Sequence, residues 1–199
     1  MLYNCPSNRS YEYSMSIQAN HSSPTIYLDM DGVIANFIQP FFHLADHYGV
    51  VYVCKTDANE HEDFFFKTII EEKIFEFLPT MKNAQKIVAL VKEMSNKYRL
   101  NVEMLTSANT YNVEVFNEVL RQKKAWLEMH GIDWKINLVS KNHEKANFAH
   151  KQSILIDDSA SCVEPFAFAG GATHLFVDYD SLETCLPSLC ESILNNKVA

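Results

Sequence analysis

Four groups of polar residues in this sequence follow short apolar runs, or stand in the loop and helix start just beyond one. They are Asp29 and Asp31, Thr106 and Ser107, Lys141 and Lys145, and Asp157 and Asp158. If the runs are parallel strands of one sheet, their carboxyl ends meet at one edge, where open α/β sheets bind ligands. Carboxylates, hydroxyls and lysines at such an edge can together hold a divalent cation and a phosphate group.

The carboxylates in this set are suited to magnesium and to phosphoryl chemistry. Mg²⁺ prefers oxygen ligands, which Asp29 and one of Asp157 and Asp158 can supply. Without a cation, four converging carboxylates would repel each other strongly. A carboxylate beside the cation can attack phosphorus. Asp31, placed past a sharp turn that Gly32 permits, suits the exchange of a proton with the leaving oxygen.

The hydroxyls and lysines are candidates for binding the phosphate itself. Thr106 and Ser107 follow the second run, and a lysine ammonium would neutralise charge on the phosphoryl oxygens. Lys141 and Lys145, which both follow the third run, are the candidate lysines. Each pair alone is a weak signal, but the ordered series of pairs after apolar runs is a specific one.

The apolar runs predict an α/β fold with a doubly wound, mainly parallel sheet. Near-continuous apolar character is typical of strands that are buried on both faces. Apolar stripes with helical spacing begin at Ala84 and at Val115, and the second ends with Met129 before Gly131. The five predicted strands are Thr25–Leu28, Asn101–Leu105, Lys135–Val139, Ser153–Ile156 and Thr173–Val177.

The stretch after the first strand is too long for one crossover helix. Residues 37–79 are rich in aromatic side chains, and we expect a small helical cap there. Most of these rings are expected to pack within the cap itself. Residues 24–36 and 80–199 would form the catalytic core, and residues 1–23 a flexible lead-in.

The composition excludes several classes of protein. With 17 basic and 25 acidic residues, the net charge of -8 disfavours binding to long nucleic acids. The basic run formed by Arg121, Lys123 and Lys124 is interpreted as a solvated helix face. Five cysteines without Cys-x-x-Cys spacing favour reduced thiols in a cytoplasmic protein. No apolar run is long enough to span a bilayer, so no membrane partner is expected, and a homodimer is left open.

Three segments resemble the haloacid dehalogenase-like (HAD) superfamily of phosphohydrolases. They are Tyr27-Leu28-Asp29-Met30-Asp31-Gly32-Val33-Ile34-Ala35-Asn36-Phe37, Leu105-Thr106-Ser107-Ala108 and Leu155-Ile156-Asp157-Asp158-Ser159. Within that superfamily the chain is most similar to the 5'(3')-deoxyribonucleotidases, including the segments 77–81 and 123–127. The resemblance runs from about residue 25 to residue 177, with only a loose match in the cap.

The resemblance implies a role for each matching residue. Asp29 would be the nucleophile and a metal ligand, and Asp31 the acid–base residue, which lends its backbone carbonyl to the metal. Asp158 would be the second carboxylate ligand of Mg²⁺, supported by Asp157. Thr106 would bind the phosphate together with a lysine, for which Lys145 is the best match.

The resemblance also implies a substrate. In that family the base of a nucleotide stacks on aromatic rings of the cap, for which Phe37, Phe64 and Phe65 are candidates. A (deoxy)nucleoside monophosphate is therefore the expected substrate of a Mg²⁺-dependent phosphatase. Two alternatives remain: the same chemistry on another ester (a sugar phosphate, a nucleic-acid 3'-phosphate or a phosphoprotein), and a non-catalytic binding domain with this fold.

Overall fold

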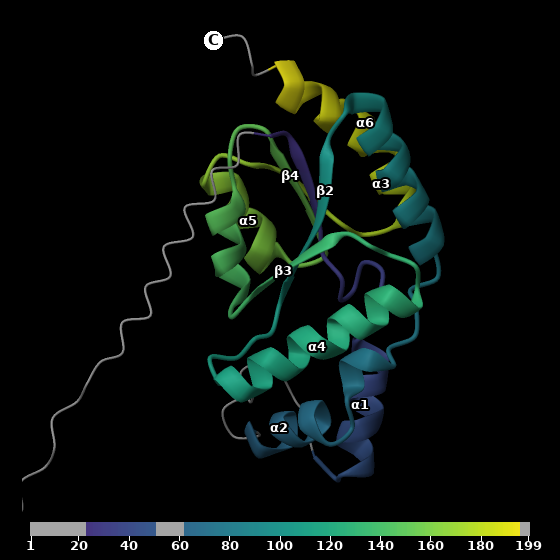
Figure 1. Ribbon diagram of the computed structural model, residues 1–199, viewed down its shortest axis with the longest axis vertical. Coiled ribbons are helices and arrows are strands. Elements are labelled where there is room, and N and C mark those ends of the chain that lie inside the picture. The colour runs from purple at the N-terminus through teal and green to yellow at the C-terminus, as the bar shows by residue number, and fades with distance from the viewer. Residues whose placement is uncertain (1–22, 51–61, 196–199) are drawn as a thin grey trace, which may run out of the picture.

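A five-stranded parallel sheet forms the centre of the molecule (Figure 1). The computed structural model describes residues 23–50 and 62–195 of the chain. The strands lie in the order β3-β2-β1-β4-β5, and all four neighbouring pairs are parallel. The strands are β1 (Thr25–Leu28), β2 (Asn101–Ser107), β3 (Lys135–Val139), β4 (Ser153–Asp157) and β5 (Ala172–Leu175).

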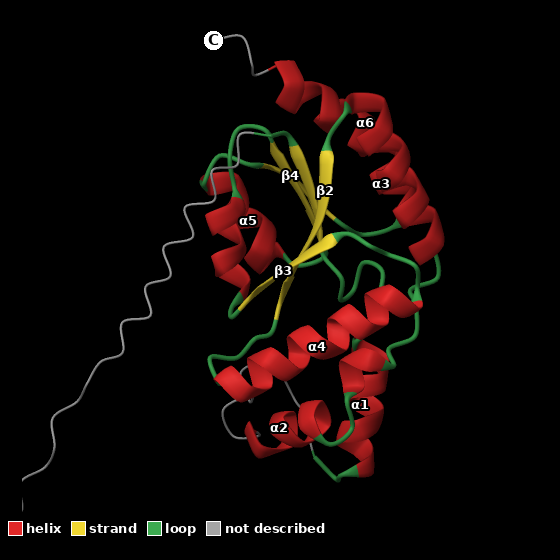
Figure 2. Cartoon of the chain, viewed as in Figure 1, coloured by secondary structure: helices red, strands yellow, loops and turns green. Residues whose placement is uncertain are grey.

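Helices cover both faces of this sheet, which completes the doubly wound α/β fold that the sequence predicts. In Figure 2, α3 and α6 lie on one side of the strands and α5 lies on the other. α4 crosses between the sheet and the pair formed by α1 and α2. The helices are α1 (Ile38–His47), α2 (Glu62–Ile70), η2 (Ile74–Glu76), α3 (Ala84–Tyr98), α4 (Val113–Met129), η3 (Asn142–Phe148), α5 (Ala160–Phe168) and α6 (Tyr179–Asn195).

The two most buried strands are β1 and β4, in which every residue is buried. Strands that lie inside a parallel sheet are covered by helices on both faces, which explains their continuous apolar sequence. Leu28 pairs with Met104 on one side and with Ile156 on the other. This register brings the ends of β1, β2 and β4 to one edge of the sheet.

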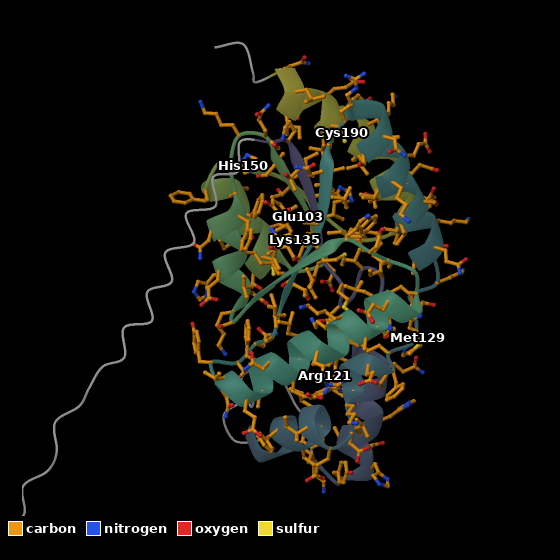
Figure 3. All side chains as sticks on the ribbon, in the orientation of Figure 1. Glu103, Arg121, Met129, Lys135, His150 and Cys190 are labelled. Atoms are coloured by element: carbon orange, nitrogen blue, oxygen red, sulfur yellow. The ribbon has the colours of Figure 1, made fainter. Side chains whose placement is uncertain are left out.

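All five predicted strands are confirmed, with shifts of at most two residues at their ends. β2 continues to Ser107 and β4 to Asp157, so the first polar residues after the apolar runs still belong to the ladder. β5 ends at Leu175, and Phe176 then donates its backbone N–H to the carbonyl of Asp157 (2.8 Å). On the edge strand β3, Lys135 pairs with Glu103 of β2 at 3.2 Å (Figure 3).

The two predicted helical stripes correspond to α3 and α4. α4 begins at a cap in which the side chain of Asn112 accepts hydrogen bonds from the backbone N–H groups of Glu114 and Val115. It ends shortly before Gly131, which has a positive φ of 67°. Met129 was included in the buried stripe by its spacing, but this was wrong, because its side chain is 62% exposed.

Aromatic side chains form the centre of the segment between β1 and α3. Phe37 stacks on Phe41 and on Phe75, with 5.2 Å between ring centroids in each pair. Phe64 packs against both Phe41 and Tyr48. These contacts agree with the expectation that most rings fill the interior of this segment. We call the elements α1, α2 and η2, together with the residues from Phe77 to Pro79 that follow η2, the cap.

α4 is attached to the cap. The indole Nε1 of Trp126 donates a hydrogen bond of 2.7 Å to the carbonyl oxygen of Leu78. Trp126 is 1% exposed, so this bond is formed inside the protein. The helix that connects β2 to β3 therefore lies between the cap and the end of the sheet, although the sequence placed it in the core segment.

Some sequence expectations fall on residues that the structure does not describe. These include nearly all of the proposed lead-in 1–23, together with Cys5 and Cys54. The cysteines of the described part, Cys162, Cys185 and Cys190, are all free. None of the described helices is long and apolar enough to cross a membrane.

Removing the indole of Trp126 tests the attachment of α4. We expect Trp126→Ala to lower the free energy of unfolding by about 3–5 kcal/mol, because it leaves a large cavity and an unpaired carbonyl. Met129→Ala on the same helix should change it by less than about 0.5 kcal/mol. Urea denaturation of both variants checks this, and equal losses would contradict the packing described above.

Candidate active site

Three carboxylates meet where β1 and β4 end. Oxygen atoms of Asp29, Asp157 and Asp158 all lie within 4.8 Å of one another. In residues 23–50 and 62–195 this is the one group of at least three potential metal ligands. His43 and His47, whose spacing could also suggest a metal site, are both exposed on α1.

A buried lysine neutralises part of this charge. Lys145 is 1% exposed, and its Nζ lies 2.6 Å from Asp157 Oδ2 and 3.0 Å from Asp29 Oδ1. Burial by itself would lower the pKa of Lys145, but the carboxylates of Asp29 and Asp157 outweigh it and raise the pKa. Lys145 therefore stays charged beside the carboxylates.

Asp157, the last residue of β4, and Asp158, which follows it, have different surroundings. Asp157 is fully buried; its Oδ2 accepts from Lys145, and its Oδ1 accepts from the backbone N–H of Ser159 (2.9 Å). Burial raises the pKa of Asp157 to about 6 and that of Asp158 to about 7, and the charge of Asp29 adds to both shifts. Such shifts indicate a site that favours additional positive charge.

The geometry around Asp29 fits a cation. Oδ1 of Asp29 is buried and, apart from its ion pair with Lys145, has no hydrogen-bond partner in the part of the chain that is described. One ammonium does not use all the acceptor capacity of this carboxylate, and oxygens of Asp157 and Asp158 lie within 4.8 Å of it. The residues present therefore fit a hard divalent cation such as Mg²⁺.

Gly32 makes room for the Asp158 carboxylate. Its φ is +84°, and a Cβ atom at this position would lie 2.1 Å from Oδ2 and 2.5 Å from Cγ of Asp158. A side chain here would collide with the carboxylate and would also strain the backbone. The glycine that permits the turn after β1 thus also allows β1 and β4 to present their carboxylates together.

A second buried lysine, Lys123, binds the carboxylate of Asp31. Lys123 is completely buried, and its Nζ lies 2.5 Å from Asp31 Oδ2 and 2.6 Å from Thr106 Oγ1. The same ammonium donates to the backbone carbonyl of Ser107 (3.2 Å). Lys123 therefore joins α4 to the ends of both β1 and β2.

The environment of Asp31 favours a carboxyl group that can carry a proton. Burial raises its pKa; the ammonium of Lys123 opposes this shift and the charge of Asp29 adds to it, and the net direction is upward. Its second oxygen, Oδ1, is buried without a hydrogen-bond partner among the described residues. An oxygen of Asp31 is thus available for a group outside the chain.

The interpretation of Arg121, Lys123 and Lys124 as a solvated face is wrong for Lys123. Lys124 is exposed, but Lys123 lies on the same face of α4 as the buried Val119 and Trp126. Lys123 stands four residues after Val119 and three before Trp126, and this helical spacing could have identified it as buried. A charged residue within an apolar stripe needs a buried partner, and here the partner is Asp31.

Ser107 and Lys141 lie at the rim of this region. Ser107 donates its hydroxyl to Asn142 Oδ1 (2.6 Å), which links the end of β2 to η3. The Nζ of Lys141 donates to the carbonyl of Asn109 and lies 5.1 Å from the ring of Tyr111. Of the two candidate lysines, Lys145 is therefore the one beside Asp29.

Two of the three candidate aromatic residues, Phe37 and Phe64, have different neighbours. Phe75 was not among those candidates, yet its ring lies 4.8 Å from Lys123 Nζ and stacks on Phe37. Phe64 is buried within the cap, where it contacts Phe41. Phe65 belongs to α2, but its side chain lies outside the described part of the structure.

Comparison with known proteins supports the fold. Neither the family models nor the curated proteins contain a match to this sequence. Among solved structures, a hydrolase from Streptococcus pneumoniae TIGR4 is similar over 82% of this chain and 98% of its own, with 17% identity and a TM-score of 0.51. A HAD family enzyme from Bacteroides thetaiotaomicron aligns over 80% and 98%, with 12% identity and a TM-score of 0.49. Of these two, the streptococcal hydrolase has a score high enough to establish a shared fold.

Substitution of Gly32 tests the packing of the carboxylates. We expect Gly32→Ala to weaken Mg²⁺ binding by about 10- to 100-fold, the range for residues that orient metal ligands, because the new Cβ displaces Asp158. Gly49→Ala is a matched control, since Gly49 also has a positive φ but no atom within 4 Å of an added Cβ. Isothermal titration with Mg²⁺ checks both variants, and equal affinities would contradict this arrangement.

Proposed function

We propose that the protein is a Mg²⁺-dependent phosphatase that hydrolyses phosphate monoesters through an aspartyl-phosphate on Asp29. The observation that carries this proposal is the meeting of three carboxylates with Lys145 at the ends of β1 and β4. The resemblance of residues 27–37, 105–108 and 155–159 to HAD phosphohydrolases supports the same conclusion.

The cation would be held by Asp29 and Asp158, with Asp157 fixing Lys145 beside them. Both oxygens of Asp157 already accept hydrogen bonds, which leaves Asp158 as the better second ligand. The backbone carbonyl of Asp31 is a further ligand implied by the resemblance. When bound, Mg²⁺ would screen the charge of the phosphate and make phosphorus more electrophilic.

In the first half of the reaction, a carboxylate oxygen of Asp29 attacks phosphorus and the bond to the ester oxygen breaks. The proton of Asp31 passes to that oxygen, so the alcohol leaves as a neutral molecule. Burial raises the pKa of Asp31, which favours the protonated form that this step needs. Asp29 then carries the phosphoryl group.

In the second half, water attacks the phosphoryl group and the bond between phosphorus and the Asp29 oxygen breaks. Asp31, now ionised, accepts a proton from the water, and inorganic phosphate leaves. Lys123 holds Asp31 Oδ2 during both halves, and the same ammonium holds the Thr106 hydroxyl. Thr106, Ser107 and Lys145 would bind the phosphoryl oxygens as negative charge develops on them.

We propose a nucleoside monophosphate as the substrate class. The likeness of residues 27–37 to the 5'(3')-deoxyribonucleotidases supports it, and so does Phe37, a partly exposed ring that stacks on the buried Phe75 beside Lys123. Aromatic walls beside a phosphate site favour a flat base over a sugar alone. The net charge of -8 disfavours a long nucleic acid as substrate.

Phosphate release from a panel of esters tests the proposal. The panel contains nucleoside 5'- and 3'-monophosphates, sugar phosphates and p-nitrophenyl phosphate, each with Mg²⁺ or with EDTA. We expect deoxynucleotide hydrolysis that EDTA abolishes and that Asp29→Asn lowers by at least about 10⁴-fold, since the nucleophile is lost. Asp133→Asn, at an exposed position, is the matched control and should keep full activity.

Two results would change this conclusion. If only sugar phosphates are hydrolysed, the proposed reaction mechanism stands and the proposed nucleotide substrate is wrong. Full activity of Asp29→Asn, or no turnover by folded protein with bound Mg²⁺, would overturn the enzyme mechanism itself.

The lysine of α4 gives a separate prediction. Lys123→Met should lower kcat by about 10²-fold or more, because Asp31 and Thr106 lose the donor that orients them. Lys124→Met is the matched control, since Lys124 is exposed and adjacent. Steady-state kinetics on the best nucleotide check both variants, and similar kcat values for the two would show that Lys123 has no role in the reaction.

A further inference from the structure

Two consecutive residues of α4 connect different parts of the molecule. Gln122 and Lys123 are both completely buried. Lys123 reaches the catalytic region, whereas Gln122 reaches the backbone of the cap. A buried glutamine amide needs several hydrogen-bond partners, so its contacts fix the surrounding backbone closely.

The Gln122 amide is paired on both sides. Its Oε1 accepts a hydrogen bond from the backbone N–H of Phe75 (3.0 Å), and its Nε2 donates to the carbonyl of Ile69 (2.6 Å). Nε2 also donates to Glu118 Oε1 on the same helix (2.8 Å). The amide thus holds the end of α2 and the middle of η2 at fixed positions against α4.

The residue fixed in this way is the one that touches Lys123. The ring of Phe75 lies 4.8 Å from Lys123 Nζ, and that ammonium bonds both Asp31 and Thr106. A cation near an aromatic face is attracted to it, so the position of the ring influences the position of the ammonium. A chain of contacts therefore runs from Gln122 through Phe75 and Lys123 to Asp31.

We propose that Gln122 is a positioning residue that places the carboxyl of Asp31 for proton transfer. By fixing the backbone of Phe75, it holds the ring against Lys123, and Lys123 then orients Asp31. This inference rests on the proposed acid–base role of Asp31. A side chain that only stabilised the cap would affect two small esters of similar size equally, whatever their leaving groups.

The leaving group distinguishes these two roles. A nucleoside alkoxide needs a proton from Asp31, whereas p-nitrophenolate leaves without one. Gln122→Met keeps the length of the side chain and removes both of its bonds to the cap. Benzyl phosphate also releases an alkoxide and is similar in size to p-nitrophenyl phosphate, so we expect its kcat to fall about tenfold more than that for p-nitrophenyl phosphate, within the range for a misplaced catalytic group.

Arg121→Met is the matched control. Arg121, labelled on α4 in Figure 3, forms an ion pair with Glu76 of η2 at 2.7 Å, so it also links α4 to the cap. Its side chain is 47% exposed, and its ion pairs are with Glu76 and Glu118. We expect the ratio of the two kcat values to stay at the wild-type level in this variant.

Phe75→Leu approaches the same chain of contacts from the cap side. It should produce the same preferential loss on benzyl phosphate, and adding Gln122→Met to it should cause little further change, because both act through one ring. Additive losses, or an unchanged ratio in both single variants, would overturn the proposal. If one of the two single variants does not fold, the other still tests the proposal.

A spectroscopic readout separates this inference from the proposed function. In ¹⁵N-lysine-labelled protein, Gln122→Met should shift or broaden the Nζ signal of Lys123, while the signal of Lys145 serves as an internal reference. An unchanged Lys123 signal would overturn the inference even if the enzyme is active. If no ester is hydrolysed, the proposed function fails, and the same spectrum still decides whether Gln122 positions Lys123.

Discussion

The arrangement of the elements around the site depends on an excess of carboxylates over ammonium groups at the end of the sheet. Four carboxylates, from Asp29, Asp31, Asp157 and Asp158, face two ammonium groups, from Lys123 and Lys145. When all four carboxylates are ionised, negative charge exceeds positive charge, and a divalent cation would balance the excess; the raised pKa values of Asp31, Asp157 and Asp158 reflect the same excess. Such a cluster would be costly if it were buried without partners. The fold therefore has to bring two lysines from separate elements to one place, and α4 and η3 supply them.

The position of α4 follows from this requirement. Lys123 can reach Asp31 because α4 passes over the ends of the strands, where Trp126 and Gln122 fasten it to the cap. A crossover helix packed flat against the sheet would place its side chains along the strands instead. The same arrangement brings the ring of Phe75 next to the lysine. The cap, α4 and the carboxylates thus form one connected set of contacts.

The sequence predicted the strands well because buried parallel strands have a simple signature of continuous apolar runs, as in Thr25–Leu28. It selected Lys145 over Lys141 through the family resemblance, and the ammonium of Lys145 lies 3.0 Å from Asp29 Oδ1. It missed Lys123, because reaching Asp31 from α4 depends on a long-range contact that local charge does not reveal. The proximity of Phe75 to Lys123 depends on the fold of the cap. The cap contains many aromatic residues, and the sequence alone does not show which of them lies beside the lysine.

The central claim is that Asp29 becomes phosphorylated during turnover. Protein mixed with Mg²⁺ and its best phosphate ester, quenched during steady-state turnover and treated with borohydride, would convert an acyl phosphate to homoserine, which peptide mass spectrometry can locate. We predict homoserine at position 29, in an amount that depends on both Mg²⁺ and ester. Phosphate release without any modified carboxylate, or modification at Asp31 or Asp157 instead, would contradict the account.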